Sequence, residues 1–238
     1  MLDHIVRGPA AGKALHNSTH HHNDQDFDVT LIDISPTLSP DSPIFPGDTP
    51  FSATRSWAID ETCPVNVSRL TMSSHGGAHA DAPLHYDRDG SAIEKVSLEP
   101  YLGACVVIDV STTHGPVSVD MVKQALGDRK GIESRVLIKT YAQQPKNWDD
   151  QMRPILAATI EWLATNKCVL IGVDTQSLDA PSSKTMDAHH AVKRADMRIP
   201  ENLLLDDVTP GRYELIALPL KLKGVDAAPV RAVLRTLP

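Results

Sequence analysis

Four side chains that can bind a metal ion lie within eleven residues of the sequence. The segment HGGAHADAPLH contains His75, His79, Asp81 and His85. A packed core would avoid so many imidazole and carboxylate groups unless a metal ion or hydrogen bonds satisfied them. The segment therefore predicts a metal centre, with His75, His79 and Asp81 as its first ligands.

The local conformation decides which of these side chains share a face. If residues 79–85 run extended, the side chains at odd positions project to one side of the strand. If residues 75–79 form a helical turn, the histidines at its two ends share a face. Gly76 and Gly77 disfavour that turn, and they instead allow the backbone to approach an ion closely or to adopt positive φ.

Three ligands rarely close a metal site, so further ligands are expected elsewhere in the chain. The candidates are the adjacent pair His189 and His190 and, beyond them, Glu201. One histidine of the pair together with Glu201 completes five nitrogen and oxygen ligands. The spacing does not decide between the two histidines, which also fit the exposed side of a basic helix.

A ligand set of nitrogen and oxygen atoms without thiolate suits zinc, manganese or iron(II). We expect zinc, with manganese as the second choice. Asp81 can bridge two ions about 3.5–4 Å apart, as carboxylates do in two-metal hydrolases. His85 is either a sixth ligand or a proton shuttle beside metal-activated water, and we favour the shuttle because imidazole exchanges a proton near neutral pH.

The elements that position these residues have an α/β pattern. Short apolar runs predict strands, and amphipathic segments between them predict helices. We expect strands at 105–110, 135–140 and 168–174, and helices at 119–126, 154–166 and 187–195. This alternation indicates a sheet that is at least partly parallel, with helical crossovers.

Two further strands are expected upstream and one downstream. Residues 29–34 precede a loop that contains five prolines between positions 36 and 50, which cannot be a helix or a central strand. Residues 65–72 alternate imperfectly and lead directly to His75. Residues 214–222 are typical of a buried strand, with Pro219 indicating an edge or a bulge.

The chain is expected to be one domain with a tail. Residues 1–27 lack sustained periodicity and predict a mobile N-terminal tail, and we exclude the histidine run 20–22 within it from the site. No linker or internal repeat divides residues 28–238. These residues therefore predict a single domain.

The composition excludes several partners. Lys and Arg number 23 against 30 Asp and Glu, and no basic run is present, so nucleic acid is not expected. No apolar stretch approaches the roughly 20 residues of a membrane span, and the first thirty residues lack the apolar region of a secretory signal. We therefore expect no membrane partner and a cytoplasmic location.

The three cysteines indicate neither disulfides nor a thiolate site, and two of them lie in apolar runs typical of buried thiols.

The chain resembles the cyclase-type metal-dependent hydrolases and, among them, the bacterial kynurenine formamidases. The resemblance runs from about residue 29 to the C-terminus. Besides the histidine motif it includes DISPTLSPDSPIFPGDTPF, CPVNVSRL, LIGVDTQSLD, SKTMDAHHAV and LLLDDVTPGRYELIALPLKLKGVDAAPVRAVLR. It implies the swivelling α/β domain of that family, with a mixed, partly barrel-like sheet. It also implies a two-zinc site, a homodimer, and hydrolysis of N-formyl-L-kynurenine to L-kynurenine and formate in tryptophan degradation.

The resemblance also implies roles for individual residues. The metal ligands become His75, His79, Asp81, His189 and Glu201. Asp81 becomes the bridge and His85 the acid/base. His189 is favoured over His190 because it directly follows MDA at the distance from Glu201 typical of the family.

Two positions depart from the family pattern. Ala78 stands where the wider family usually has threonine. Phe45 stands where many relatives have a tryptophan that contacts the substrate, so an aromatic face for an anthraniloyl group is retained.

Two other functions fit parts of the pattern. Another hydrolase of the same family, acting on a cyclic amide such as isatin, would keep the metal site and differ around Phe45. A noncatalytic metal-binding or metabolite-binding protein would keep the fold, but it has no need of an acid/base at His85.

Overall fold

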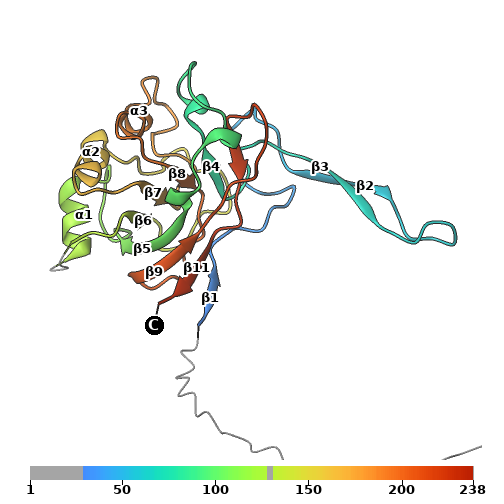
Figure 1. The fold of residues 1–238 in the computed structure, drawn as a ribbon, viewed down its shortest axis with the longest axis horizontal. Helices are drawn as coiled ribbons and strands as arrows, with labels where there is room; N and C mark the ends of the chain where they lie inside the picture. The colour runs from blue at the N-terminus through green and yellow to red at the C-terminus, as the bar shows by residue number, and fades with distance from the viewer. Residues whose placement is uncertain (1–28, 128–130, 238) are drawn as a thin grey trace, which may run out of the picture.

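The computed structural model describes residues 29–127 and 131–237 (Figure 1). The predicted tail, with its histidine run, lies outside the described residues. Among the described helices, none is both long and apolar enough to cross a bilayer. The single domain expected for residues 28–238 stays a prediction.

A six-stranded mixed sheet forms the centre of the fold. Its order is β1 (Leu31–Asp33), β11 (Val233–Thr236), β9 (Gly211–Ile216), β5 (Leu102–Asp109), β6 (Arg135–Lys139) and β7 (Leu170–Val173). β5, β6 and β7 are parallel, and the other pairings are antiparallel. This confirms an α/β fold with a partly parallel sheet. β1 and β7 remain as its edges, and a barrel-like closure and the swivelling architecture stay predictions.

Three helices cover one face of this sheet. They are α1 (Val119–Leu126), α2 (Ala157–Thr165) and α3 (Asp187–Arg194), and they lie together on one side of the strands in Figure 1. Their apolar side chains pack on alternate residues of β5, β6 and β7, such as Ile108, Ile138 and Ile171. Because helices on one side and further chain on the other bury the parallel strands on both faces, these strands are continuous apolar runs.

A small antiparallel sheet lies against the other face. Its order is β10 (Ala227–Pro229), β4 (His79–Asp81) and β8 (Ile199–Glu201). Ala80 of β4 belongs to the second apolar core, together with Val107 and Leu137 of the large sheet. Since neighbouring side chains on a strand point to opposite faces, His79 and Asp81 point away from this core.

A two-stranded arm extends from the body. It consists of β2 (Ser52–Trp57) and β3 (Val67–Thr71), paired antiparallel with a bulge near Arg55. Figure 1 shows the arm projecting well beyond the rest of the described chain, and all its strand residues are exposed. β3 ends shortly before His75, as the sequence predicts.

Most predicted elements are confirmed, and one strand is wrong in part. α1, α2 and α3 lie within the three predicted helical ranges. The strand expected at 214–222 is β9, which begins earlier and ends at Ile216. The chain leaves the sheet before Pro219 because proline has no N–H group to pair.

The three cysteines are free thiols. Cys105 and Cys168 are buried, as expected from their apolar runs. Burial raises the pKa of both thiols to about 12. Neither is suited to act as a nucleophile near neutral pH.

Candidate metal centre and active site

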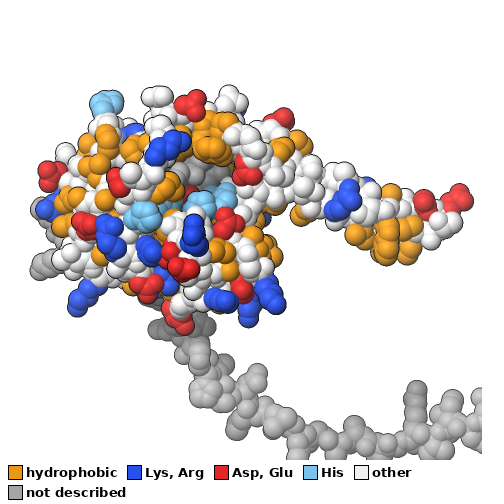
Figure 2. Space-filling view, turned by 90° about the horizontal axis from the view of Figure 1, so that it is seen from above, with side chains coloured by type: hydrophobic (Ala, Val, Ile, Leu, Met, Phe, Trp, Pro, Cys, Tyr) orange, Lys and Arg blue, Asp and Glu red, His pale blue; other side chains and the backbone are white. Residues whose placement is uncertain are grey.

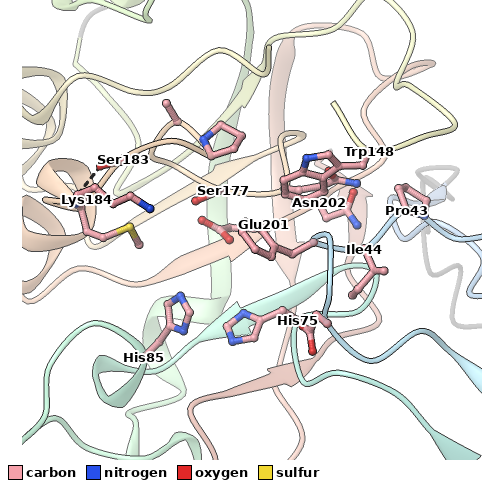
Figure 3. A pocket seen from close by; sticks show the side chains of 16 residues that line it. Pro43, Ile44, His75, His85, Trp148, Ser177, Ser183, Lys184, Glu201 and Asn202 are labelled. Atoms are coloured by element: carbon pink, nitrogen blue, oxygen red, sulfur yellow. Dashed lines mark hydrogen bonds between the residues drawn. The ribbon is translucent and has the colours of Figure 1, made fainter. Parts of the chain in front are cut away.

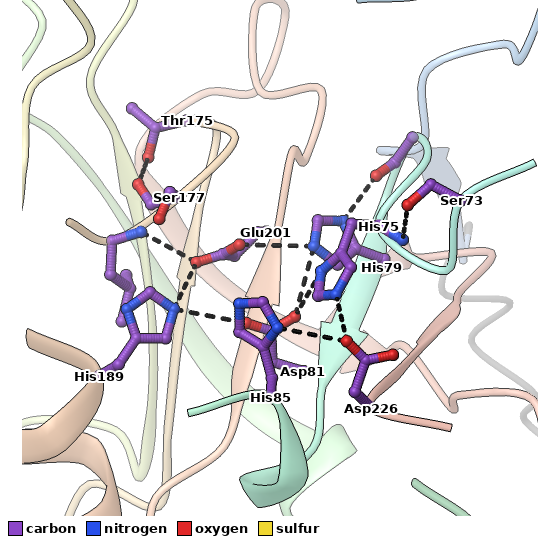
Figure 4. Close-up of polar contacts among 12 residues, drawn as sticks. Ser73, His75, His79, Asp81, His85, Thr175, Ser177, His189, Glu201 and Asp226 are labelled. Atoms are coloured by element: carbon purple, nitrogen blue, oxygen red, sulfur yellow. Dashed lines mark hydrogen bonds and ion pairs between the residues drawn. The ribbon is translucent and has the colours of Figure 1, made fainter. Parts of the chain in front are cut away.

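The pairing of β4 with β8 brings two predicted ligands from distant parts of the chain together. His79 lies opposite Glu201 in the strand register. Nε2 of His79 lies 3.4 Å from Oδ1 of Asp81 and 3.4 Å from Oε2 of Glu201. All three side chains are buried, and together they form the floor of the site (Figure 4).

His75 reaches the same cluster from the turn before β4. Neither the helical turn nor an extended strand forms here, because Gly77 adopts a φ of +67°. A side chain there would be strained at this φ and its Cβ atom would meet Leu38 Cδ2 at 2.7 Å, so the turn favours glycine. Nδ1 of His75 lies 3.1 Å from Oδ1 of Asp81.

The structure places His189, and not His190, in the cluster. His189 is buried in the first turn of α3, whereas His190 is exposed. Nε2 of His189 lies 3.4 Å from Oδ2 of Asp81 and 3.6 Å from Oε1 of Glu201. Its other ring nitrogen, Nδ1, lies 2.6 Å from Oδ2 of Asp179, which orients the imidazole.

Four buried atoms of the cluster have no hydrogen-bond partner among the described residues. They are Nε2 of His79, both carboxylate oxygens of Asp81 and Nε2 of His189. Burying such groups without a partner is costly, and a cation would satisfy all four. Nitrogen and oxygen donors of this kind fit a divalent ion such as zinc or manganese.

Asp81 belongs to two groups of possible ligands. His75, His79 and Asp81 offer donor atoms within 4.8 Å of one another, and so do Asp81, His85 and His189. A carboxylate shared between two donor groups is the arrangement that a two-metal site requires.

The carboxylates and histidines of the cluster shift one another's pKa values. Burial alone would lower the pKa of His79 and His189, but nearby carboxylates outweigh it and raise each pKa to about 10. The carboxylates beside His79 are Asp81 and Glu201, and Asp179 and Asp81 act on His189. In return, the histidines hold the pKa of Asp81 well below its usual range despite burial. Without a metal, protons on the imidazoles therefore compensate the carboxylates.

His85 lies at the mouth of the cluster. Of the alternatives, an extended segment forms at His79–Asp81, but it does not continue to His85, because Pro83 begins a 3-10 turn that ends there. The ring centroid of His85 lies 4.3 Å from that of His75 and 5.8 Å from that of His189. The side chain is 30% accessible, so it can reach both the cluster and a bound substrate.

A cavity of about 400 Å³ opens onto the cluster. Figure 2 shows histidine side chains gathered around a hollow in the body. His75, His85, Glu201 and Trp148 line the cavity (Figure 3). Phe45 also lines it and forms an aromatic wall with Trp148. The centroids of these two rings are 5.2 Å apart, edge to face. Phe45 therefore lines the cavity beside the histidine cluster, and its contact with a substrate stays a prediction.

Comparison with known proteins places the chain in a family. The sequence profile of the Cyclase family matches residues 32–180. A kynurenine formamidase from Maricaulis maris (strain MCS10) is 55% identical over 211 residues, which cover 87% of this chain and 99% of that protein. The chain belongs to the cyclase family.

Solved structures share the fold of this cyclase-family chain. A potential metal-dependent hydrolase with cyclase activity is 26% identical, with a TM-score of 0.74 over 88% of this chain and 99% of its own. An isatin hydrolase bound to the product analogue thioisatinate gives a TM-score of 0.77 over 88% of this chain and 93% of its own. At 22% identity the second likeness shows the fold alone.

Three residues at the site of this cyclase-family chain were not found from the sequence. Asp226 precedes β10, and its Oδ2 lies 3.0 Å from Nε2 of His75 and 3.3 Å from Nδ1 of His85 (Figure 4). Asp179 lies in the loop before α3, and Trp148 in the loop after β6. Asp179 and Asp226 lie inside stretches that resemble the family, so the resemblance could have pointed to them. No motif or periodic pattern around Trp148 indicates a place at the site.

Proposed function

We propose that this protein hydrolyses N-formyl-L-kynurenine to L-kynurenine and formate, a step of tryptophan degradation. The observation that carries the proposal is a set of buried, unpartnered metal-binding atoms beside a cavity with an aromatic wall. The 55% identity to a kynurenine formamidase along 99% of its length supports this substrate.

The residues that would hold the metal are the five expected from the sequence. His75, His79, Asp81, His189 and Glu201 would hold two zinc ions, or manganese as the alternative, and Asp81 would be the ligand common to both. A divalent ion bound there would polarise the formyl carbonyl and lower the pKa of a water molecule. Asp179 and Asp226 would orient the imidazoles of His189 and His75.

His85 is placed to move the proton. In the hydrolysis a water oxygen bonds to the formyl carbon, the carbon–nitrogen bond breaks, and the arylamine nitrogen gains a proton. When Nδ1–H of His85 donates to Asp226, Nε2 is left as a proton acceptor. We propose that Nε2 takes a proton from the attacking water and delivers it to the departing amine.

The aromatic wall selects the substrate ring. The rings of Phe45 and Trp148 lie at 78° to each other, and each can contact an anthraniloyl ring by face or by edge. Phe45 and Trp148 line the same cavity as His75, His85 and Glu201. A substrate ring held at the aromatic wall would therefore keep its formamide group against His85 and the metal-binding cluster.

A comparison of substrates tests this function. The purified, metal-loaded protein is given N-formyl-L-kynurenine or isatin, and release of each product is followed by absorbance. We expect N-formyl-L-kynurenine to have the much higher kcat/KM. A preference for isatin would support the other hydrolase of the same family. Bound metal without turnover of either would support a noncatalytic binding protein.

We also propose a homodimer, formed through the β2–β3 arm. Trp57 and Leu70 on the arm are 61% and 60% exposed, and Ile59 is exposed at its tip. A free two-stranded hairpin is marginally stable, and exposed apolar patches mark contact surfaces. Light scattering should give a dimer mass for the native chain and a monomer mass for the Trp57→Ser, Leu70→Ser double variant.

A cytoplasmic location stays a prediction from the sequence.

A further inference from the structure

One wall of the cavity carries a cation that the proposed hydrolysis does not use. The loop between β7 and α3 forms this wall, with Gln176, Ser177 and Lys184 among its residues. Figure 3 shows the Lys184 side chain directed into the cavity, on the side away from Trp148. Lys184 makes no ion pair with any residue that the structure describes.

The same loop carries an unpartnered acceptor. Oε1 of Gln176 is buried and has no hydrogen-bond partner within residues 29–127 and 131–237. Buried polar atoms are nearly always paired, so this oxygen is open to a donor from water or from a ligand. Gln176 also lines the cavity, and thus a ligand in the cavity can supply that donor.

The charges around the cavity explain why a cation is needed there. Asp48 and Glu201 also line it. The Asp48 carboxylate is held by the Ser73 hydroxyl, with 2.5 Å between the oxygens. A substrate carboxylate entering this cavity would be repelled unless a positive group neutralised it. Among the described residues of the lining, Lys184 is the one Lys or Arg side chain.

We propose that the β7–α3 loop binds the amino-acid tail of the substrate. The Lys184 ammonium group binds the α-carboxylate, and the Gln176 side-chain oxygen accepts a hydrogen bond from the α-ammonium group. The aromatic ring then lies at Phe45 and Trp148, and the formamide lies at the histidine cluster. This inference rests on the proposed function and narrows it to aryl formamides that carry a zwitterionic tail.

The test compares two substrates that differ only in the tail. They are N-formyl-L-kynurenine and 2-formamidoacetophenone, which keeps the aryl ketone and the formamide and lacks the amino-acid group. The variants are Lys184→Met and Lys184→Arg, and Lys221→Met on the exposed surface is the control. Because a hydrogen bond to a charged group is lost at a solvent-accessible position, Lys184→Met should raise KM for N-formyl-L-kynurenine about tenfold.

The substrate without the tail should respond differently. Its kcat/KM should stay within about twofold of the native value in Lys184→Met, since no ionic contact is lost. Lys184→Arg should recover most of the affinity for N-formyl-L-kynurenine. Gln176→Leu, checked by circular dichroism for folding, should raise KM for the same substrate only.

Two results would overturn the inference. They are an equal loss on both substrates, and no change on N-formyl-L-kynurenine in either the Lys184 or the Gln176 variant. If the native, metal-loaded protein hydrolysed neither aryl formamide, the proposed function itself would be contradicted, which is a separate result.

Discussion

Nδ1 of His189 lies 2.6 Å from Oδ2 of Asp179, and this contact decides which nitrogen of the imidazole faces the cluster. The same carboxylate accepts the backbone N–H groups of Ala188 and His189 at the start of α3. The residue at the N-cap of α3, Met186, makes no side-chain capping bond. Asp179 therefore caps the helix and orients its histidine at the same time.

Asp179→Asn should weaken metal binding while the fold is retained. The amide oxygen can still accept one backbone N–H group, but an amide N–H beside Nδ1 favours the tautomer whose Nε2 carries a hydrogen and cannot bind metal. We expect zinc affinity to fall about 10- to 100-fold, measured by competition with a chelator. His190→Ala, at the exposed neighbour, is the control. Equal zinc affinity in Asp179→Asn and the native chain would show that this contact does not orient the ligand.

His85→Ala and Asp81→Ala should separate proton transfer from metal binding. His85 is part-exposed and held by Asp226, whereas Asp81 is buried between the two donor groups. We expect His85→Ala to lose kcat by about 100-fold or more with its metal content unchanged. Asp81→Ala should lose the metal as well. Equal metal loss in both variants, measured by elemental analysis, would make His85 a ligand.

Replacing the aromatic wall should change substrate binding more than the chemical step. Phe45→Leu keeps an apolar side chain of similar size and removes the ring that lies at 78° to Trp148. We expect KM for N-formyl-L-kynurenine to rise about three- to tenfold with kcat nearly unchanged, since the ring contact is lost. Phe45→Trp is the matched control and should keep the native KM. A fall in kcat alone would place Phe45 outside the ring-binding wall.

Asp174→Asn should stabilise the protein at alkaline pH more than at acidic pH. Burial raises the pKa of Asp174 to about 6 although Thr140 and Tyr141 donate hydrogen bonds to it. As pH falls through 6, the folded protein takes up a proton that the unfolded chain takes up only near 4, so native stability rises. The neutral amide avoids the buried charge at all pH values. We expect a gain of about 1–3 kcal/mol at pH 8 that shrinks towards pH 5, measured by urea unfolding. A difference in the free energy of unfolding between Asp174→Asn and the native protein that stays the same from pH 5 to pH 8 would contradict this prediction.

The local part of the site could be predicted from the spacing of its residues, whereas His189 and Glu201 were assigned through the family resemblance and Asp226 was not found. His79 and Asp81 share a face because they alternate with Ala80 on β4, which is a pattern of neighbouring residues. Asp226 lies 151 positions from His75 and reaches it only because β10 pairs with β4. Pairing between distant strands of three residues leaves no periodic signal.

The same reasoning applies to the fold. The three helices and the strands β5, β6 and β7 were predicted because they repeat an apolar pattern over enough residues. Every residue of the arm strands is exposed, so neither has a buried face that would impose a regular alternation; β3 was predicted from an imperfect alternation, and β2 was missed. β8, which carries Glu201, was missed as a strand because three residues do not establish an alternation, and β4 was considered only as part of a longer extended segment, residues 79–85.

The most direct test of the central claim is the rate of kynurenine release from N-formyl-L-kynurenine in three samples. They are the protein as purified, after chelation, and after zinc is restored. Because a cation would satisfy the unpartnered atoms of His79, Asp81 and His189, we expect turnover that disappears with the metal and returns with it. Turnover that survives complete metal removal, or no turnover in a folded protein loaded with zinc, would contradict the account.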